Sequence, residues 1–159
     1  MFKSLLIKFS TAVRQSTIKR LVIVPGGYEN WKISKGALSF AQIAQHIIDL
    51  DYWTLEKIKN PTLKSIETQN VEDLVCTRKE YENLILKLKE SLEVKLKFIA
   101  SLTDEDLEGK IYDDRFDEEV SITWIILRGN LDHEIHHRGQ IAAYLRALED
   151  KISDNIGVG

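Results

Sequence analysis

Apolar residues recur every three to four positions along most of the chain, a spacing that is typical of amphipathic helices. Clear stop signals divide the pattern, since Pro25-Gly26-Gly27 ends the first segment and Asn60-Pro61 ends the second. Thr77 precedes the third segment, and Glu80 three residues later completes a capping-box pattern. The sequence therefore predicts helices over residues 1–24, 39–59, 77–99 and 122–148.

The first predicted helix is basic, because no acidic residue precedes Glu29. An organelle presequence or a membrane-surface helix would also show this pattern. We favour an ordinary bundle helix, because the apolar positions form one stripe that a core would bury. That stripe consists of Phe2, Leu5, Leu6, Phe9, Val13, Leu21 and Val24. No apolar run approaches the about 20 residues needed to span a bilayer, so we expect no membrane partner.

Two long polar connections separate the later segments. Residues 61–76 are unpatterned and numerous enough to cross the length of a bundle. Residues 104–119 carry nine acids, and we expect a solvated loop with short extended pieces there. The loop begins like a calcium-binding loop, but Arg115 stands where a bidentate glutamate is required. We therefore predict an all-α four-helix bundle with a long crossover connection, formed as a single domain by residues 1–159.

Composition supports one globular domain and excludes several classes of protein. Of 159 residues, 43% are hydrophobic and 30% charged, and only 8 glycines and 2 prolines occur, which disfavours a turn-rich β fold. Cys76 is the single cysteine, which excludes an intrachain disulfide and a multi-cysteine metal site and favours the reducing cytoplasm. The net charge of −3 argues against a nucleic-acid partner.

Three of the four histidines share a predicted environment. His133 and His137 are four residues apart, so on a helix they lie about 40° apart on one face. His46 lies on the apolar face of the second predicted helix, with Ile43 and Leu50. Any one of them alone fits a hydrogen-bonded core residue. Together they favour a divalent metal site, because coordination to a metal replaces the hydrogen bonds to water that imidazoles lose on burial. Three ligands would leave coordination positions on the metal open.

The fourth histidine and the neighbouring acid raise an alternative. His136 lies at the edge of the inward face, and we assign it a supporting or structural role. Residues 133–137 also satisfy the zincin pattern H-E-x-x-H, in which the glutamate is the general base. The chain has Gln140 and Ala143 where the extended metzincin pattern requires glycine and histidine. We therefore reject a metalloprotease and place Glu134 on the helix surface.

The helix faces that carry the histidines also supply weak catalytic candidates. Gln140 faces inward, where it is able to orient a ligand or a histidine, and Tyr144 is a candidate hydrogen-bond donor. Asp49 follows His46 by one turn. Trp53 is expected as an apolar wall or as core packing. Gly129 has no side chain one turn before His133, which leaves room for a partner helix or a ligand.

Two stretches of the sequence resemble a known family. The residues around His46 read AQHIIDLDYW, and those from His133 to Arg146 read HEIHHRGQIAAYLR. Both are similar to the DinB/YfiT-like metalloenzymes, and the second stretch is the more specific. The resemblance covers nearly the whole chain. It implies a four-helix bundle, a homodimer, and one divalent metal ion, zinc or nickel, held by His46, His133 and His137.

The family resemblance also suggests an activity, since the family includes transferases and isomerases that use mycothiol, bacillithiol or glutathione. Our leading hypothesis is a metal-dependent S-transferase, in which the metal lowers the pKa of a low-molecular-weight thiol co-substrate that attacks a small electrophile. Cys76 lies far in sequence from every histidine, so we expect the reactive thiol to come from the bound small molecule.

Two other functions fit the same residues. One is a metal-dependent hydrolase that uses a metal-bound water, with Asp49 or Tyr52 as the candidate general base. The other is a non-catalytic stress-response or binding protein, in which the metal cross-links the second and fourth helices.

Overall fold

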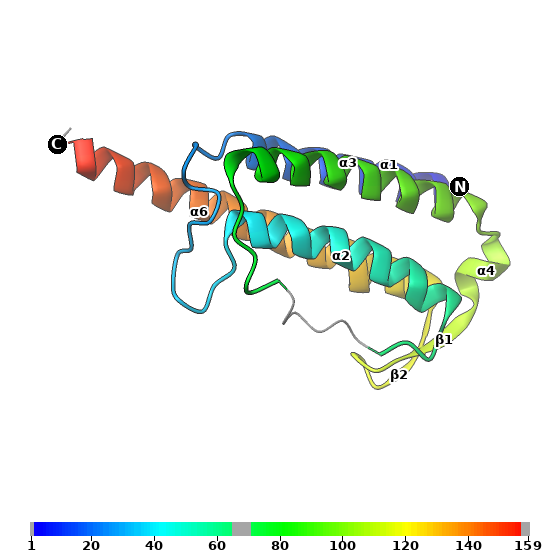
Figure 1. Cartoon of the computed structure of the whole chain (residues 1–159). Coiled ribbons are helices and arrows are strands. Elements are labelled where there is room, and N and C mark those ends of the chain that lie inside the picture. Colours follow the sequence, from blue (N-terminus) through cyan, green and yellow to red (C-terminus); the bar gives the residue numbers. More distant parts are fainter. Residues whose placement is uncertain (1, 65–70, 157–159) are drawn as a thin grey trace.

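The computed structural model describes residues 2–64 and 71–156, and most of these residues lie in long helices packed side by side (Figure 1). The helices are α1 (Phe2–Val22), α2 (Phe40–Lys59), α3 (Arg78–Ser101), α4 (Asp104–Glu108), α5 (Ile122–Trp124), the π-helix η2 (Ile125–Leu131) and α6 (Asp132–Ile156). Two short strands, β1 (Lys110–Asp113) and β2 (Glu118–Ser121), form an antiparallel hairpin.

Side-chain caps fix where the central helices begin. The Ser39 hydroxyl accepts from the Gln42 backbone N–H, and the Gln42 side chain accepts from the Ser39 N–H in return. Thr77 and Glu80 form the same reciprocal pair at the start of α3. Each pair satisfies backbone donors that have no partner within the helix. The predicted starts of α2 and α3 are therefore confirmed.

The bundle has an unusual order of helix directions. α2 and α3 run the same way, while α1 and α6 run the opposite way (Figure 1). Two parallel helices that follow each other in sequence require a connection that returns along the bundle, and this connection joins Lys59 to Arg78. The predicted four-helix bundle with a long crossover is confirmed, although residues 65–70 of the predicted crossover 61–76 lie outside the described residues.

The acidic stretch contains more structure than the sequence pattern predicts. Thr103 caps the short helix α4, with Asp106 as its reciprocal partner. The hairpin pairs Lys110 with Ser121 and Asp113 with Glu118. The expectation of extended pieces was therefore right, but the expectation of a plain loop missed α4.

The fourth long helix is not one continuous α-helix. Residues 125–131 form a π-helix, in which the N–H of Asp132 donates to the carbonyl of Leu127, five residues earlier. A π-helix has more residues per turn than an α-helix, so the α-helical spacing of side chains does not hold for residues 125–131. The helix also continues to Ile156, beyond the predicted end at Leu148.

The N-terminal helix is buried along a different face from the one expected. Phe2, Leu5 and Phe9 are exposed, Leu5 to 61%, and with Leu6 and Leu127 they form an apolar depression of about 350 Å³. The predicted stripe is therefore wrong for these three residues, although Leu6, Val13, Leu21 and Val24 are buried.

Among the described residues, no helix combines the length and apolar character needed to cross a membrane.

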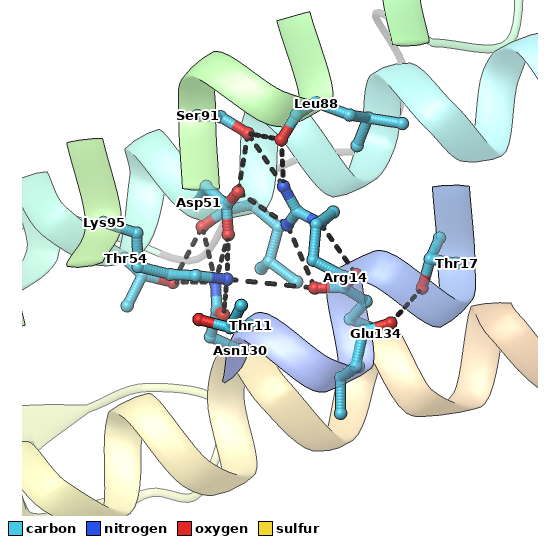
Figure 2. A network of polar contacts seen from close by, with 12 residues as sticks. Thr11, Arg14, Thr17, Asp51, Thr54, Leu88, Ser91, Lys95, Asn130 and Glu134 are labelled. Atoms are coloured by element: carbon cyan, nitrogen blue, oxygen red, sulfur yellow. Dashed lines mark hydrogen bonds and ion pairs between the residues drawn. The ribbon is translucent and has the colours of Figure 1, made fainter. Parts of the chain in front are cut away.

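The apolar core is divided by a layer of buried polar side chains. On α3, Ser91 and Lys95 lie between Leu88 of one apolar cluster and Ile99 of the other. On α1, Arg14 occupies the equivalent position and is fully buried. The buried charge layer, as we call it, consists of Arg14, Asp51, Ser91, Lys95, Asn130 and Glu134 (Figure 2).

Arg14 is the centre of the buried charge layer (Figure 2). Its guanidinium donates to Asp51 at 2.7 Å and to both carboxylate oxygens of Glu134 at 2.7 and 3.0 Å. Lys95 donates to the second oxygen of Asp51 at 2.6 Å. Burial would raise the pKa of Asp51, but Lys95 and Arg14 outweigh burial and lower it to about 2. The Asp51 carboxylate therefore remains charged beside Arg14 and Lys95, and the layer pairs two basic side chains with two acidic ones.

We predict that Arg14→Met lowers the free energy of unfolding by about 3–5 kcal/mol, because it removes the bidentate partner of the buried Glu134 and one of the two cations paired with the buried Asp51. Urea denaturation of the metal-free protein measures this loss. Lys19→Met removes an exposed cation from the same helix and should change stability by less than about 0.5 kcal/mol. Equal stabilities of the two variants would contradict the role given to the buried charge layer.

Candidate metal centre

The structure brings three histidines from two helices together. His46 comes from α2, and His133 and His137 come from successive turns of α6. Their possible ligand atoms all lie within 4.8 Å of one another, and the Nε2 atoms of His46 and His133 are 2.9 Å apart. Metal–nitrogen distances of about 2.0–2.1 Å place two ligand nitrogens roughly 3 Å apart, so this spacing fits one shared ion.

Burial keeps all three imidazoles neutral. His46 and His137 are buried and His133 is half-buried. Burial lowers the pKa of His46. Burial together with the neighbouring His137 and His46 lowers the pKa of His133 to about 3. Burial also lowers the pKa of His137 to about 4, although its bond to Gln140 opposes the change. Neutral imidazoles hold the free lone pair that a metal requires.

Gln140 determines which nitrogen of His137 is available. Its Oε1 atom lies 2.7 Å from Nδ1 of His137, so Nδ1–H donates to Gln140 and Nε2 holds the lone pair. That Nε2 atom is buried and has no hydrogen-bond partner among the described residues. A buried nitrogen that accepts nothing is costly, and a metal ion would satisfy it. This is the supporting bond expected behind a histidine ligand.

His136 and Glu134 take no part in the cluster. His136 is exposed, and its ring packs against the His137 ring in a T-shaped arrangement. The expected surface position of Glu134 is wrong, because this side chain is buried and paired with Arg14. α6 has two buried faces, one toward α2 and one toward α1, and the single-face wheel missed the second. A glutamate held by Arg14 is not free to serve as a zincin general base.

The space beside Gly129 is filled by Arg115 rather than by a ligand or partner helix. A Cβ atom at Gly129 would lie 2.4 Å from Nη2 of Arg115, and Nη1 donates to the Gly129 carbonyl at 3.2 Å. The guanidinium also stacks 4.1 Å from the centre of the Trp53 ring. Trp53 is buried and its Nε1–H donates to the carbonyl of Lys64, so it combines core packing with support of Arg115.

The other candidates lie at different distances from the histidines. Asp49 is half-buried on α2, one turn after His46, and accepts from Gln45 at 2.7 Å. Burial raises the pKa of Asp49. Tyr144 lies two turns beyond His137, roughly 10 Å along the axis, and packs against Trp31 and Phe40. Tyr52 is exposed.

Cys76 is buried at the start of α3, where Asn30 bonds to its backbone. Burial raises the pKa of its thiol, which disfavours the reactive thiolate.

Sequence reasoning missed two arginines that matter to this region. The sequence pattern presents Arg115 only as a mismatch in a calcium loop, and it leaves Arg14 undistinguished within the basic first helix. Gly129 is the one sequence signal that points to Arg115, because a residue without a side chain allows another group to approach the helix backbone closely. Nothing in the sequence distinguishes Arg14 from the exposed cations of its helix.

The sequence model of the DinB family matches residues 3–150, and the chain belongs to this family. None of the curated proteins matches the chain at a significant level. The fold is similar to that of several solved structures that share little sequence identity with it.

YfiT from Bacillus subtilis, described as a probable metal-dependent hydrolase with an unusual four-helix bundle topology, has a TM-score of 0.77 at 15% identity. The match covers 92% of this chain and 87% of YfiT. A DinB-like protein from Bacillus cereus gives 0.70 at 21% identity, and the DinB-like protein YjoA from Bacillus subtilis gives 0.67 at 19%. Both of these matches cover 91% of each chain.

We predict that Gln140→Ala weakens binding of a divalent metal by about 10–100-fold, because His137 loses the partner that fixes its tautomer. Competition with a chromogenic chelator measures the affinity. Gln140→Glu keeps an acceptor at the same position and should retain most of the metal affinity. Gln15→Ala, which changes an exposed glutamine, is the matched control. An affinity unchanged in Gln140→Ala would show that Gln140 does not support the site.

Proposed function

We propose that the protein is a metal-dependent enzyme that transfers a low-molecular-weight thiol to a small electrophile. His46, His133 and His137 would hold one divalent ion, zinc or nickel. Such an ion, when bound, lowers the pKa of a coordinated thiol and so favours the nucleophilic thiolate. The observation that carries the proposal is the convergence of three neutral histidines around a buried Nε2 atom that has no partner among the described residues.

The side chains around the histidines support a site that reacts with a molecule from solution. Three protein ligands leave coordination positions open, as in catalytic rather than structural metal sites. The buried, weakly acidic thiol of Cys76 is not suited to be the nucleophile, so the thiol would be a co-substrate. Its sulfur forms a bond to the electrophilic carbon; chloride leaves and the thiol proton passes to solvent, or an epoxide oxygen takes up that proton.

A metal-dependent hydrolase is the second candidate, in which water replaces the thiol as the nucleophile. Two observations favour it. YfiT, which has a similar fold, is described as a probable metal-dependent hydrolase. Asp49 lies one turn from His46, half-buried and hydrogen-bonded by Gln45, which suits a carboxylate that accepts a proton.

The two candidates are separated by their need for a thiol. Metal-loaded protein is incubated with mycothiol, bacillithiol or glutathione and a chlorinated or epoxide electrophile, and the loss of free thiol is followed. We expect one thiol to react at least roughly tenfold faster than with metal-free protein, because a pKa about one unit lower raises the thiolate fraction nearly tenfold. The metal-treated His137→Ala variant should show no such increase, whereas His136→Ala should.

Other outcomes decide between the alternatives. Turnover of chromogenic esters or amides without added thiol would support the hydrolase and contradict the transferase. If metal removal lowers the unfolding temperature but neither assay shows a metal-dependent rate, the ion has a structural role and both enzyme proposals fail.

A further inference from the structure

Arg115 places a guanidinium group beside the three histidines. It is carried by the turn of the β1–β2 hairpin and reaches two of the bundle helices, stacking on Trp53 of α2 and donating to the Gly129 carbonyl of η2. Trp53 follows His46 by seven residues, roughly 10 Å along the helix, and Gly129 precedes His133 by four, roughly 6 Å. The guanidinium therefore lies one to two helical turns from the histidine cluster.

The residues that Arg115 contacts lie on the same side of their helices as the histidines. Trp53 follows His46 by two turns of α2, and both side chains are buried. Gly129 precedes His133 by about one turn, and the guanidinium occupies the space that a Cβ atom at Gly129 would fill. The guanidinium therefore lies on the histidine side of both helices.

The arrangement holds the guanidinium rigidly and leaves part of it available. Asp113 is fully buried and pairs with Nε and Nη2, while Gly129 accepts from Nη1. Among the described residues these contacts use three of the five guanidinium N–H bonds, so two donors are left. The Arg115 side chain is 20% exposed, so part of it is in contact with solvent.

We propose that Arg115 is a carboxylate-binding residue of the metal centre, which would make the preferred ligand a small molecule with a metal-binding group at one end and a carboxylate at the other. This inference rests on the proposed function, because it assumes that the thiol or the substrate is the molecule that coordinates the metal. An arginine with a fixed orientation binds a carboxylate through charge-assisted hydrogen bonds.

The expected effect is moderate, because Asp113 already balances the charge of Arg115. Recognition then depends on the two directed N–H donors rather than on a long-range field. One charge-assisted contact corresponds to a preference of roughly tenfold for a carboxylate over a neutral group of the same length.

Cobalt-substituted protein tests the inference with a matched pair of ligands, 3-mercaptopropionate and 3-mercaptopropanol. Both carry the same thiol and differ in the group at the other end. Coordination of the thiolate changes the cobalt absorption spectrum, which gives a dissociation constant for each ligand. The unmodified protein should bind the carboxylate roughly tenfold more tightly.

Variants of the ion pair then locate the preference. Arg115→Gln alone would leave the buried Asp113 unpaired, so the double variant Asp113→Asn/Arg115→Gln is used, in which both groups are neutral. It should bind both thiols equally while keeping the affinity for the neutral one. Gly129→Ala leaves the charge of Arg115 but displaces its guanidinium, and should reduce the preference for the carboxylate ligand. Arg128→Gln removes an exposed arginine of η2 that is paired with Asp132, and this variant should keep the preference for the carboxylate ligand.

A preference that persists in the double variant would overturn the role of Arg115. Failure of the proposed function gives a different result, in which neither thiol changes the cobalt spectrum. Propionate and propanol are therefore compared by nuclear magnetic resonance titration of the same proteins. Tighter binding of propionate that is lost with Arg115 supports the inference, and equal binding of the two contradicts it.

Discussion

Arg14 extends from α1 to the point where all four long helices meet (Figure 2). Its guanidinium bonds to Asp51 of α2, to Leu88 and Ser91 of α3, and to Glu134 of α6. Buried charges lose their hydration on folding, so these contacts are favourable only when every partner is in place. This requirement selects one register for the helices, whereas the two apolar clusters on either side would tolerate small shifts.

The histidine cluster depends on the same register. Glu134 follows His133 directly, and Asp51 lies five residues after His46. Fixing Glu134 and Asp51 to one arginine therefore also fixes how the two ligand-bearing helices face each other. The π-helix η2 adds to this, because Asn130 bonds to Asp51 and Lys95 and ties the segment before His133 to the buried charge layer. The buried charge layer and the histidine cluster are thus neighbouring polar regions within one core.

Much of the fold and of the candidate centre follows from local sequence signals. Ser39 and Thr77 mark helix starts because their hydroxyls satisfy backbone donors close in sequence. The spacing of His133 and His137 places them on one helix face for the same local reason. The π-helix, the burial of Glu134 and the packing of Arg115 against Gly129 depend on partners far away in sequence. A helical wheel contains no information about those partners.

The central claim is that the three convergent histidines hold one divalent metal ion, with His136 outside the set. Elemental analysis of protein prepared without an affinity tag tests it most directly. The unmodified protein and His136→Ala should each contain about one divalent ion per chain, and His46→Ala and His137→Ala should contain almost none. Equal metal content in all four proteins, or none in the unmodified protein after exposure to zinc and nickel, would contradict the account.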